Sequence, residues 1–492
     1  MAAATASDGQ LMMNDVVPTA AMMMMIATAV AVIWLMVRRR RHVYIVDYGC
    51  YRAPSTIRTP FSSFMEYSRL SGSFDTKSLD FQRKILCRSG VSQLTALPQS
   101  LHFLPPRITI SHERHECHDV LFGAIDELLS RVGPPNFSPS QIDVLVSNCS
   151  VFSPSPSITS MVINRYGLGP HVKSFSLSGM GCSAGILALD LARRVLLANP
   201  RSCSYALVLS TENLTRSWYH GNDRSMLVTN CLFRVGGSAV LLSNRRSDRR
   251  RSKYEVLHTA RSHIGADDNA YRCVFQEEDK QGVVGVGLSK DLMRCAAVAL
   301  EHNMRLLGPK VLPLREIFLY YADHLSRRLR SRLRLLLLKQ QQQQQMKLKL
   351  KMKMKMKTKT TKGVLQEEAA YVPKFKDAFD NVCIHAGGKA VIRAMEAALG
   401  LPLAMSEPSH MTLYRYGNIS SSSVWYELSY EEAKGRIKKG NRVWQIGLGS
   451  GFKCSSAVLR ALHTIPSSIS TCWDDCIADM PISLDDQLED RP

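Results

Sequence analysis

Gly179-Met180-Gly181-Cys182-Ser183-Ala184-Gly185 is the stretch that decides the fold. It follows the alternating run 172–178, which predicts a buried strand, and it opens the apolar run 186–197, which has the length of a helix. Cys182 is therefore predicted at a strand-to-helix turn. The glycines permit a tight turn and close approach of a ligand, and the helix N-terminus offers free N–H groups and partial positive charge. This environment favours a reactive thiolate, whereas a cysteine among small residues is otherwise a buried small hydrophobe.

The rest of the chain repeats the alternation of strands and helices. We expect further strands at 43–48, 142–146, 204–210, 236–242, 254–259, 379–384 and 442–446, and helices at 61–70, 157–166, 292–306, 389–399 and 424–437. This alternation predicts an α/β fold with a mostly parallel sheet covered by helices. The histidines between 112 and 118 lack the spacing of a zinc site and run into a helical pattern, so we expect them on a solvated helix face and predict no metal.

Charge is concentrated in one segment of the 492 residues. The net charge is +21, and fourteen arginines and lysines with no acidic residue lie between Arg327 and Lys362. The excess is therefore local, and we predict an anionic small substrate or a membrane surface rather than nucleic acid as partner. Within this segment, residues 340–362 combine a glutamine tract with alternating lysines, which favours a disordered loop over a strand with one cationic face. Thirteen cysteines without paired spacing indicate a reducing compartment.

The N-terminal region carries a membrane signal. After a short tail, 1–15, residues 16–37 are almost wholly apolar and have the length needed to span a bilayer. Four arginines, 38–41, follow at once, whereas a cleaved signal peptide would carry its positive charges before the apolar run. The pattern predicts a transmembrane signal anchor with the rest of the chain in the cytosol.

Three polar residues share one kind of position with respect to the predicted strands. Cys182, His385 and Asn418 each stand at the end of a strand-like segment, next to glycine and before a helix. Such loops gather at one edge of an α/β sheet, where active sites form. Cysteine would be the acylated nucleophile, histidine would carry or donate a proton, and asparagine would donate a hydrogen bond to an oxyanion. The loop Gly449, Ser450, Gly451 is suited to placing backbone N–H groups beside a substrate carbonyl.

Several longer strings resemble one family, the plant 3-ketoacyl-CoA synthases, the condensing enzymes of very-long-chain fatty acid elongation. The resemblance runs from about Val43 to Cys476. The strings that carry it are Val146-Ser147-Asn148-Cys149-Ser150, the Cys182 motif, Asn230-Cys231-Leu232-Phe233-Arg234, Arg261-Ser262-His263, Cys383-Ile384-His385-Ala386-Gly387-Gly388, Gly417-Asn418-Ile419-Ser420-Ser421-Ser422-Ser423, and Gly449-Ser450-Gly451-Phe452-Lys453-Cys454.

The resemblance implies a thiolase-like fold of two similar α/β halves in five layers, here 43–244 and 254–476, in a homodimer. It implies that Cys182 carries the substrate acyl group and that His385 and Asn418 bind the malonyl thioester carbonyl during decarboxylation. His263 matches a further family histidine with either a supporting or a chemical role. The implied substrates are malonyl-CoA and a long-chain acyl-CoA, without a cofactor.

The resemblance also implies a cellular setting, and the chain departs from the family at several points. The setting is the endoplasmic reticulum membrane, with a cytosolic catalytic domain and ketoreductase, dehydratase and enoyl reductase subunits as partners. The family usually has histidine where this chain has Asn381 and Tyr414, it tends to show two membrane segments instead of one, and the 340–362 insert is unlike it. Two alternatives follow: a catalytically weakened scaffold subunit of the elongase, or a soluble-type polyketide synthase or acyl carrier protein-dependent condensing enzyme.

Overall fold

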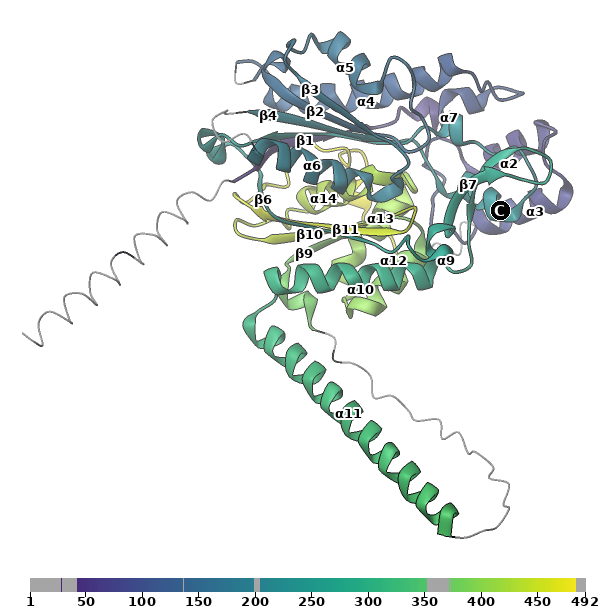
Figure 1. Cartoon of the computed structure of the whole chain (residues 1–492). Coiled ribbons are helices and arrows are strands. Elements are labelled where there is room, and N and C mark those ends of the chain that lie inside the picture. Colours follow the sequence, from purple (N-terminus) through teal and green to yellow (C-terminus); the bar gives the residue numbers. More distant parts are fainter. Residues whose placement is uncertain are drawn as a thin grey trace, which may run out of the picture.

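Two helices, α6 (Ala184–Ala198) and α14 (Ser423–Ala433), lie in the middle of the molecule with sheet on either side (Figure 1). This computed structural model describes residues 28, 42–135, 137–198, 204–351, 371 and 373–483. Both helices contact strands of the two halves of the chain, α6 through β2, β4, β10 and β11, and α14 through β1, β9 and β10. Every residue of α14 is buried, as expected for a helix enclosed on all sides.

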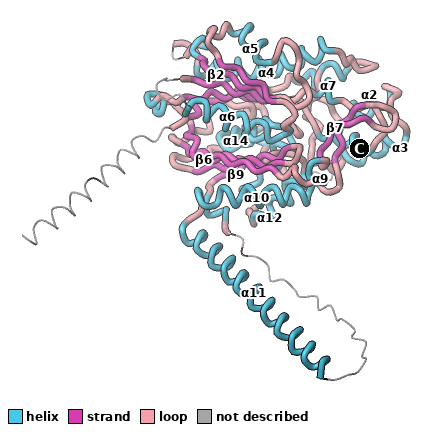
Figure 2. The backbone as a smooth tube through the Cα atoms, in the orientation of Figure 1, coloured by secondary structure: helices cyan, strands magenta, loops and turns pink. Residues whose placement is uncertain are grey.

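One nine-stranded sheet folds around these helices (Figure 2). Its strand order is β3 (Lys173–Leu177), β2 (Ile142–Asn148), β4 (Tyr205–Thr211), β5 (Gly237–Ser243), β1 (Tyr44–Cys50), β6 (Tyr254–His263), β11 (Lys453–Ala461), β10 (Arg442–Gly449) and β9 (Asn381–Ile384). β1 and β6 pair through only two residue pairs, Tyr44 with Glu255 and Ile45 with Tyr254. This short junction joins the strands of the first half to those of the second half.

The prediction of a mostly parallel sheet is wrong. β2 runs parallel to β3 and β4, and β9 runs parallel to β10, but the other five pairings are antiparallel. Parallel neighbours need a long crossover, whereas β10 and β11 are joined by the three residues 450–452. The strand β11 was not predicted from the sequence, so this hairpin was missed.

Helices cover the outer faces and complete five layers (Figure 1). α4 (Ile110–Val132) and α5 (Ile158–Tyr166) cover the first half, and α10 (Leu292–Val311) and α12 (Lys389–Leu399) cover the second half. α13 (Leu403–Tyr416) packs on α14 and β9. The histidines between 112 and 118 lie on α4, as predicted. Beyond the layers lie α2 (Phe61–Leu70), α3 (Thr76–Leu86), α7 (Leu214–Ser217), α8 (Arg224–Leu232), α9 (Asp268–Tyr271) and a hairpin of β7 (Val274–Glu278) and β8 (Val284–Leu288).

The basic insert begins in α11 (Leu314–Lys351), which projects from the body (Figure 1). This helix continues through the glutamine tract, where a disordered loop was expected from residue 340. Leucine, glutamine, lysine and methionine are all good helix formers, and neither glycine nor proline interrupts them before Lys351. Residues 352–362 of the insert lie outside the described residues. So does the predicted membrane span 16–37, apart from Thr28; the part of the chain that the structure describes holds no helix both long and apolar enough to cross a membrane.

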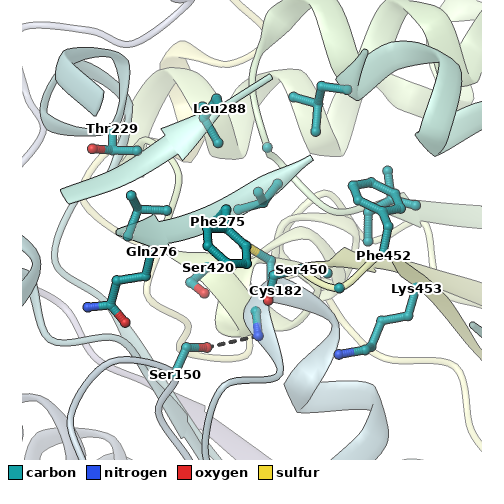
Figure 3. A pocket seen from close by; sticks show the side chains of 18 of the residues that line it. Ser150, Cys182, Thr229, Phe275, Gln276, Leu288, Ser420, Ser450, Phe452 and Lys453 are labelled. Carbon is teal, nitrogen blue, oxygen red and sulfur yellow. Dashed lines mark hydrogen bonds between the residues drawn. The ribbon is translucent and has the colours of Figure 1, made fainter. Parts of the chain in front are cut away.

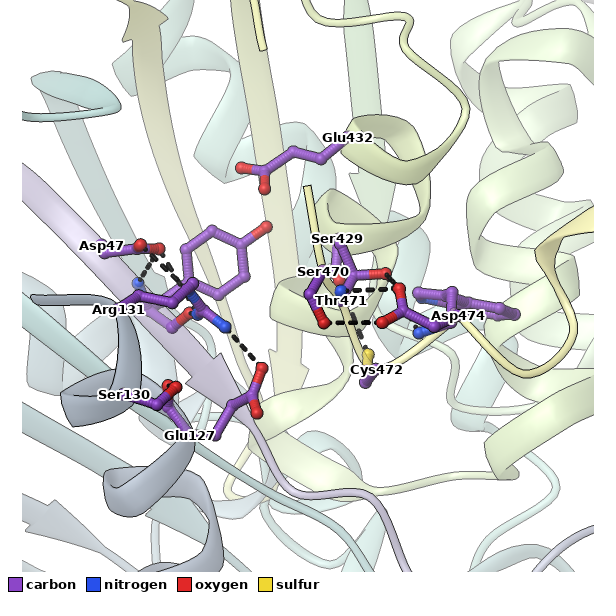
Figure 4. A network of polar contacts seen from close by, with 12 residues as sticks. Asp47, Glu127, Ser130, Arg131, Ser429, Glu432, Ser470, Thr471, Cys472 and Asp474 are labelled. Carbon is purple, nitrogen blue, oxygen red and sulfur yellow. Dashed lines mark hydrogen bonds and ion pairs between the residues drawn. The ribbon is translucent and has the colours of Figure 1, made fainter. Parts of the chain in front are cut away.

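A buried ionic network ties an outer helix, the sheet and the central layer together; Figure 4 shows its contact between Asp47 and Arg131 and the position of Glu432. Asp47 on β1 accepts from Arg131 Nε on α4 at 3.1 Å and pairs with Lys253 Nζ at 2.9 Å. The same Lys253 Nζ donates to Glu432 Oε2 on α14 at 2.9 Å. Burial opposes ionisation of Asp47, but Lys253 and Arg131 outweigh it and lower the pKa of that carboxyl.

We expect Lys253→Met to lower the free energy of unfolding by about 3 kcal/mol, because it leaves two buried carboxylates without their shared cation. Glu432 is only 1% exposed and cannot recover its partner from water. The exposed Lys439→Met is the matched control and should change the free energy by less than about 0.5 kcal/mol. Denaturant unfolding followed by tryptophan fluorescence measures both variants, and equal stability of the two would contradict the role of the network.

Candidate active site

A cavity of about 720 Å³ contains every residue that the sequence predicted for the site. These residues are Cys182, His385, Asn418, His263, Gly449, Ser450 and Gly451. They come from both halves of the chain and from loops that are up to 269 residues apart, counted from Cys182 to Gly451. The structure therefore brings together all the groups that were singled out from separate motifs.

Cys182 lies in the 3-10 turn Gly181–Ser183 that leads into α6. Gly181 has a φ of +64°, and a Cβ at this position would lie 2.5 Å from the Ser450 backbone nitrogen, so only glycine fits. The Gly181 N–H donates to Ser150 Oγ at 3.0 Å, which fixes the turn from the other side (Figure 3). The predicted strand-to-helix position of Cys182 is confirmed, but the strand before it, β3, lies at the edge of the sheet and has no buried residue, so the prediction of a buried strand is wrong.

The protonation state of Cys182 departs from the expected thiolate. Burial raises the pKa of Cys182 to about 12, although a hydrogen bond from Ser420 acts in the opposite direction. Loss of hydration therefore outweighs the hydrogen bonds that favour the thiolate. The resting nucleophile is a neutral thiol, which must lose its proton when it attacks.

His385 provides a neutral ring in the same cavity. It follows β9, and its backbone N–H donates to Ile446 O at 2.9 Å on β10. Burial lowers the pKa of His385 to about 4, so the ring is uncharged at neutral pH. Its Nδ1 has no hydrogen-bond partner among the described residues. A neutral imidazole can accept the thiol proton or donate an N–H to a carbonyl oxygen.

Asn418 follows α13 and Gly417, so the prediction that it ends a strand is wrong. Only an isolated bridge to Phe233 gives this position strand character. Its Nδ2 donates to Gly387 O at 3.2 Å, and its Oδ1 accepts from Ser420 N–H at 2.9 Å. These two contacts fix the orientation of the amide and leave one N–H for a ligand. Ser420 adopts a φ of +53°, the one positive value among the described residues other than glycine, and such strain is typical of functional loops.

Glu212 and Lys453 line the cavity but were missed as site residues. Glu212 accepts from the backbone N–H groups of Ser150 and Val151 at 3.0 and 3.1 Å, and burial raises its pKa. It therefore orders the loop that in turn holds Gly181. A lone acidic residue after a strand gave no signal in the sequence, and Lys453 was quoted only as part of a family string.

One wall of the cavity is apolar and includes the β7–β8 hairpin (Figure 3). Phe275 of this hairpin lines the same cavity as Cys182. The apolar side chains of the lining include Leu232, Phe233, Val274, Phe275, Val286, Leu288, Leu292, Ala296 and Val391. The cavity thus offers polar groups around the thiol and an apolar space beside it, which suits a substrate with a reactive head and a hydrocarbon tail.

The two positions that depart from the resembled family lie outside the cavity lining. Asn381 starts β9, at the opposite end of the strand from His385, and its side chain contacts Glu431. Tyr414 packs against the central core from α13. Neither substitution removes a group from the surface that a substrate would touch.

Known proteins that are similar in sequence identify the family of the chain. Residues 35–329 match the family model described as FAE1/Type III polyketide synthase-like protein, and residues 375–461 match the C-terminal model of 3-oxoacyl-[acyl-carrier-protein] synthase III. Two Arabidopsis thaliana proteins, 3-ketoacyl-CoA synthase 4 and 3-ketoacyl-CoA synthase 9, are each 47% identical to the chain; the alignments cover 91% and 92% of it and 80% of each relative. The chain belongs to the 3-ketoacyl-CoA synthase family.

Solved structures agree on the fold. The C-terminal type III polyketide synthase domain of Steely1 from Dictyostelium aligns with a TM-score of 0.60 at 18% identity, over 86% of this chain and 99% of that domain. A fungal type III polyketide synthase, ORAS, aligns with a TM-score of 0.55 at 20% identity, over 85% of this chain and 99% of its own. These likenesses confirm the α/β thiolase-like fold that the resemblance implied.

The neutral state of the Cys182 thiol predicts how its alkylation rate depends on pH. Iodoacetamide should alkylate Cys182 at a rate that rises about tenfold per pH unit between pH 7 and pH 9, because the thiolate fraction grows tenfold per unit below the pKa. Mass spectrometry of the Cys182 peptide measures the rate. In the urea-unfolded chain, the control, the rate should level off near the ordinary cysteine pKa of about 8.5. A plateau below pH 8 in the folded protein would contradict the buried neutral thiol.

Proposed function

We propose that the chain catalyses the decarboxylative condensation of malonyl-CoA with a long-chain acyl-CoA, giving CO2, free CoA and a 3-ketoacyl-CoA two carbons longer. The reaction is an acyl transfer, and its product, a 3-ketoacyl-CoA, is the one that the names of the relatives state. The observation that carries the proposal is the convergence of Cys182, His385 and Asn418 in one cavity with an apolar wall. The scaffold alternative loses its support, since Asn381 and Tyr414 do not line that cavity.

The first half-reaction transfers the acyl group to Cys182. The thiol sulfur attacks the acyl-CoA thioester carbonyl, its proton passes to the neutral ring of His385, and free CoA leaves with that proton. The Ser420 contact to the sulfur stabilises the anion that forms during attack. The apolar wall receives the acyl chain, whose burial favours binding in proportion to its length.

The second half-reaction forms the new carbon–carbon bond. Malonyl-CoA loses CO2, and the electron pair of the broken bond moves into the thioester to give an enolate. His385 and the remaining N–H of Asn418 donate to the enolate oxygen, and the Asn418 amide is already oriented because Gly387 and Ser420 hold it. The enolate carbon then attacks the acyl thioester on Cys182, and the sulfur leaves as thiolate and takes up a proton.

The proposal is tested on membranes that contain the full chain, with labelled malonyl-CoA and a series of acyl-CoAs of increasing length. The unmodified chain should form a 3-keto product, and Cys182→Ala should form none. Asn418→Ala should still become acylated on Cys182 but condense about 10²- to 10³-fold more slowly, because it lacks an oxyanion donor. A product that persists in Cys182→Ala, or a folded protein that converts no acyl-CoA, would contradict the proposal.

The proposal includes the cellular setting of the family. The chain is proposed to be an endoplasmic reticulum membrane enzyme with a cytosolic catalytic domain. It is proposed to act as a homodimer beside the reductase and dehydratase subunits. The surface of α11 supports contact with a membrane. Six of its exposed apolar residues recur every three or four positions, which places these six on one helix face, and arginines flank them. These residues are Phe318, Tyr321, Leu325, Leu329, Leu333 and Leu336.

The proposed topology predicts the outcome of protease digestion. In sealed microsomes with the cytosolic face outward, trypsin should cut the chain within α11 without detergent, at the exposed Arg328, Arg330 or Arg332. A lumenal marker protein in the same vesicles serves as the control and should stay intact. Cleavage of α11 only after detergent is added would place this domain on the lumenal side and contradict the topology.

A further inference from the structure

Lys453 is a buried cation with no assigned role. It is the first residue of β11, lies opposite His263 of β6 and lines the cavity with only 8% of its surface exposed. Burial lowers the pKa of Lys453, and no carboxylate among the described residues acts on it in the opposite direction. The carboxylate that does line the cavity, Glu212, is bound by the Ser150 and Val151 backbone. An unpaired buried ammonium is costly unless a ligand supplies the anion.

His263 adds a second donor beside Lys453. Its Nδ1 accepts from the Gly265 N–H at 3.0 Å, so the neutral ring carries its proton on Nε2. Partial burial, together with the Lys453 charge, lowers the pKa of His263 and keeps the ring neutral at pH 7. The Nε2–H is therefore a donor, and the two side chains offer an ammonium and an N–H to the same part of the cavity.

Gly451 keeps the space between these donors open. A Cβ at Gly451 would lie 3.5 Å from Lys453 Nζ and 3.7 Å from His263 Nε2, so the two nitrogens are at most about 7.2 Å apart. One anion with two or more oxygens can reach both at ordinary hydrogen-bond lengths of about 2.8 Å. Ser450 of the same turn touches Gly181, and Figure 3 shows the Lys453 side chain extending toward the loop that holds Cys182. The anion would therefore lie near the reacting atoms.

We propose that Lys453, together with the Nε2–H of His263, binds the free carboxylate of malonyl-CoA. This inference rests on the proposed function. The carboxylate belongs to the reacting end of malonyl-CoA, whereas the CoA phosphates lie at the other end of the pantetheine arm. A long-chain acyl-CoA has no such carboxylate, so Lys453 distinguishes the extender unit from the acyl donor.

The contact acts on binding and orientation more than on bond cleavage. Held by two donors, the carboxylate fixes the bond that breaks relative to the thioester plane. During decarboxylation the negative charge moves from the carboxylate to the thioester oxygen, and CO2 leaves uncharged. Lys453 then has no anion to retain, so the contact is stronger in the ground state than in the transition state, and loss of the lysine should raise KM for malonyl-CoA without lowering kcat.

Lys453→Met in the full chain tests the inference, with Lys439→Met on the exposed surface as the matched control. Lys453→Met should raise KM for malonyl-CoA about tenfold or more, the effect expected for one charged hydrogen bond. Acylation of Cys182 by a long-chain acyl-CoA, and the Ki of acetyl-CoA against malonyl-CoA, should stay within about twofold of the unmodified chain. Lys453→Arg should recover part of the KM, because it restores the charge.

Two kinetic results overturn the inference. An unchanged KM for malonyl-CoA in Lys453→Met would exclude a contact between Lys453 and malonyl-CoA. An equal loss of affinity for malonyl-CoA, acyl-CoA and acetyl-CoA would identify a CoA phosphate as the anion instead. A binding measurement on the unmodified chain tests the same contact without a variant that could misfold. The methyl ester of malonyl-CoA should bind about tenfold more weakly than malonyl-CoA, and equal binding would contradict the proposal. Absence of both acylation and condensation in the unmodified chain would instead refute the proposed function itself.

Discussion

Close backbone contact around Cys182 is the constraint on which the site depends. The turn before α6 touches the Gly449–Gly451 turn from the second half. At Gly185, near the start of α6, a Cβ atom would lie only 2.4 Å from the Ser421 carbonyl oxygen. Side chains at Gly181 or Gly185 would separate these segments. The nucleophile is thus held where loops from both halves meet, and the five layers serve to bring those loops together.

This enclosure removes water from the site, and the loss of hydration sets the protonation states of its side chains. Burial keeps both Cys182 and His385 uncharged, so the resting site holds a thiol and an imidazole instead of an ion pair. Charge appears only when substrate arrives, on the sulfur in one half-reaction and on the thioester oxygen in the other. Ser420 and Asn418 are oriented before that moment, which is what preorganised stabilisation requires.

The sequence allowed the site to be predicted better than the sheet. Cys182, His385 and Asn418 were found because glycines mark tight turns and polar residues beside them have few structural reasons to be there. The directions of strands were not predictable in the same way, since alternating strands and helices suggested parallel neighbours. β11 was missed because its residues are buried on both faces in the central sheet, so no polar alternation marks it.

Residues whose role depends on neighbours distant in the sequence could not be recognised from the sequence around them. Glu212 orders the Ser150 loop from a separate strand, and Lys453 gains its significance only because β11 pairs with β6 and places it beside His263. The Cys182 pKa was misjudged for a related reason: the helix N-terminus can be seen in sequence, whereas the extent of burial depends on the opposite half of the chain.

The central claim is that Cys182 carries the acyl group, and mass spectrometry of the Cys182 peptide tests it most directly. The purified chain is incubated with a long-chain acyl-CoA in the absence of malonyl-CoA, digested and analysed. The account predicts that this peptide gains the mass of the acyl group and loses it in a single turnover when malonyl-CoA is added, with the 3-ketoacyl product appearing at the same rate. An unmodified Cys182 peptide during active product formation would contradict the account.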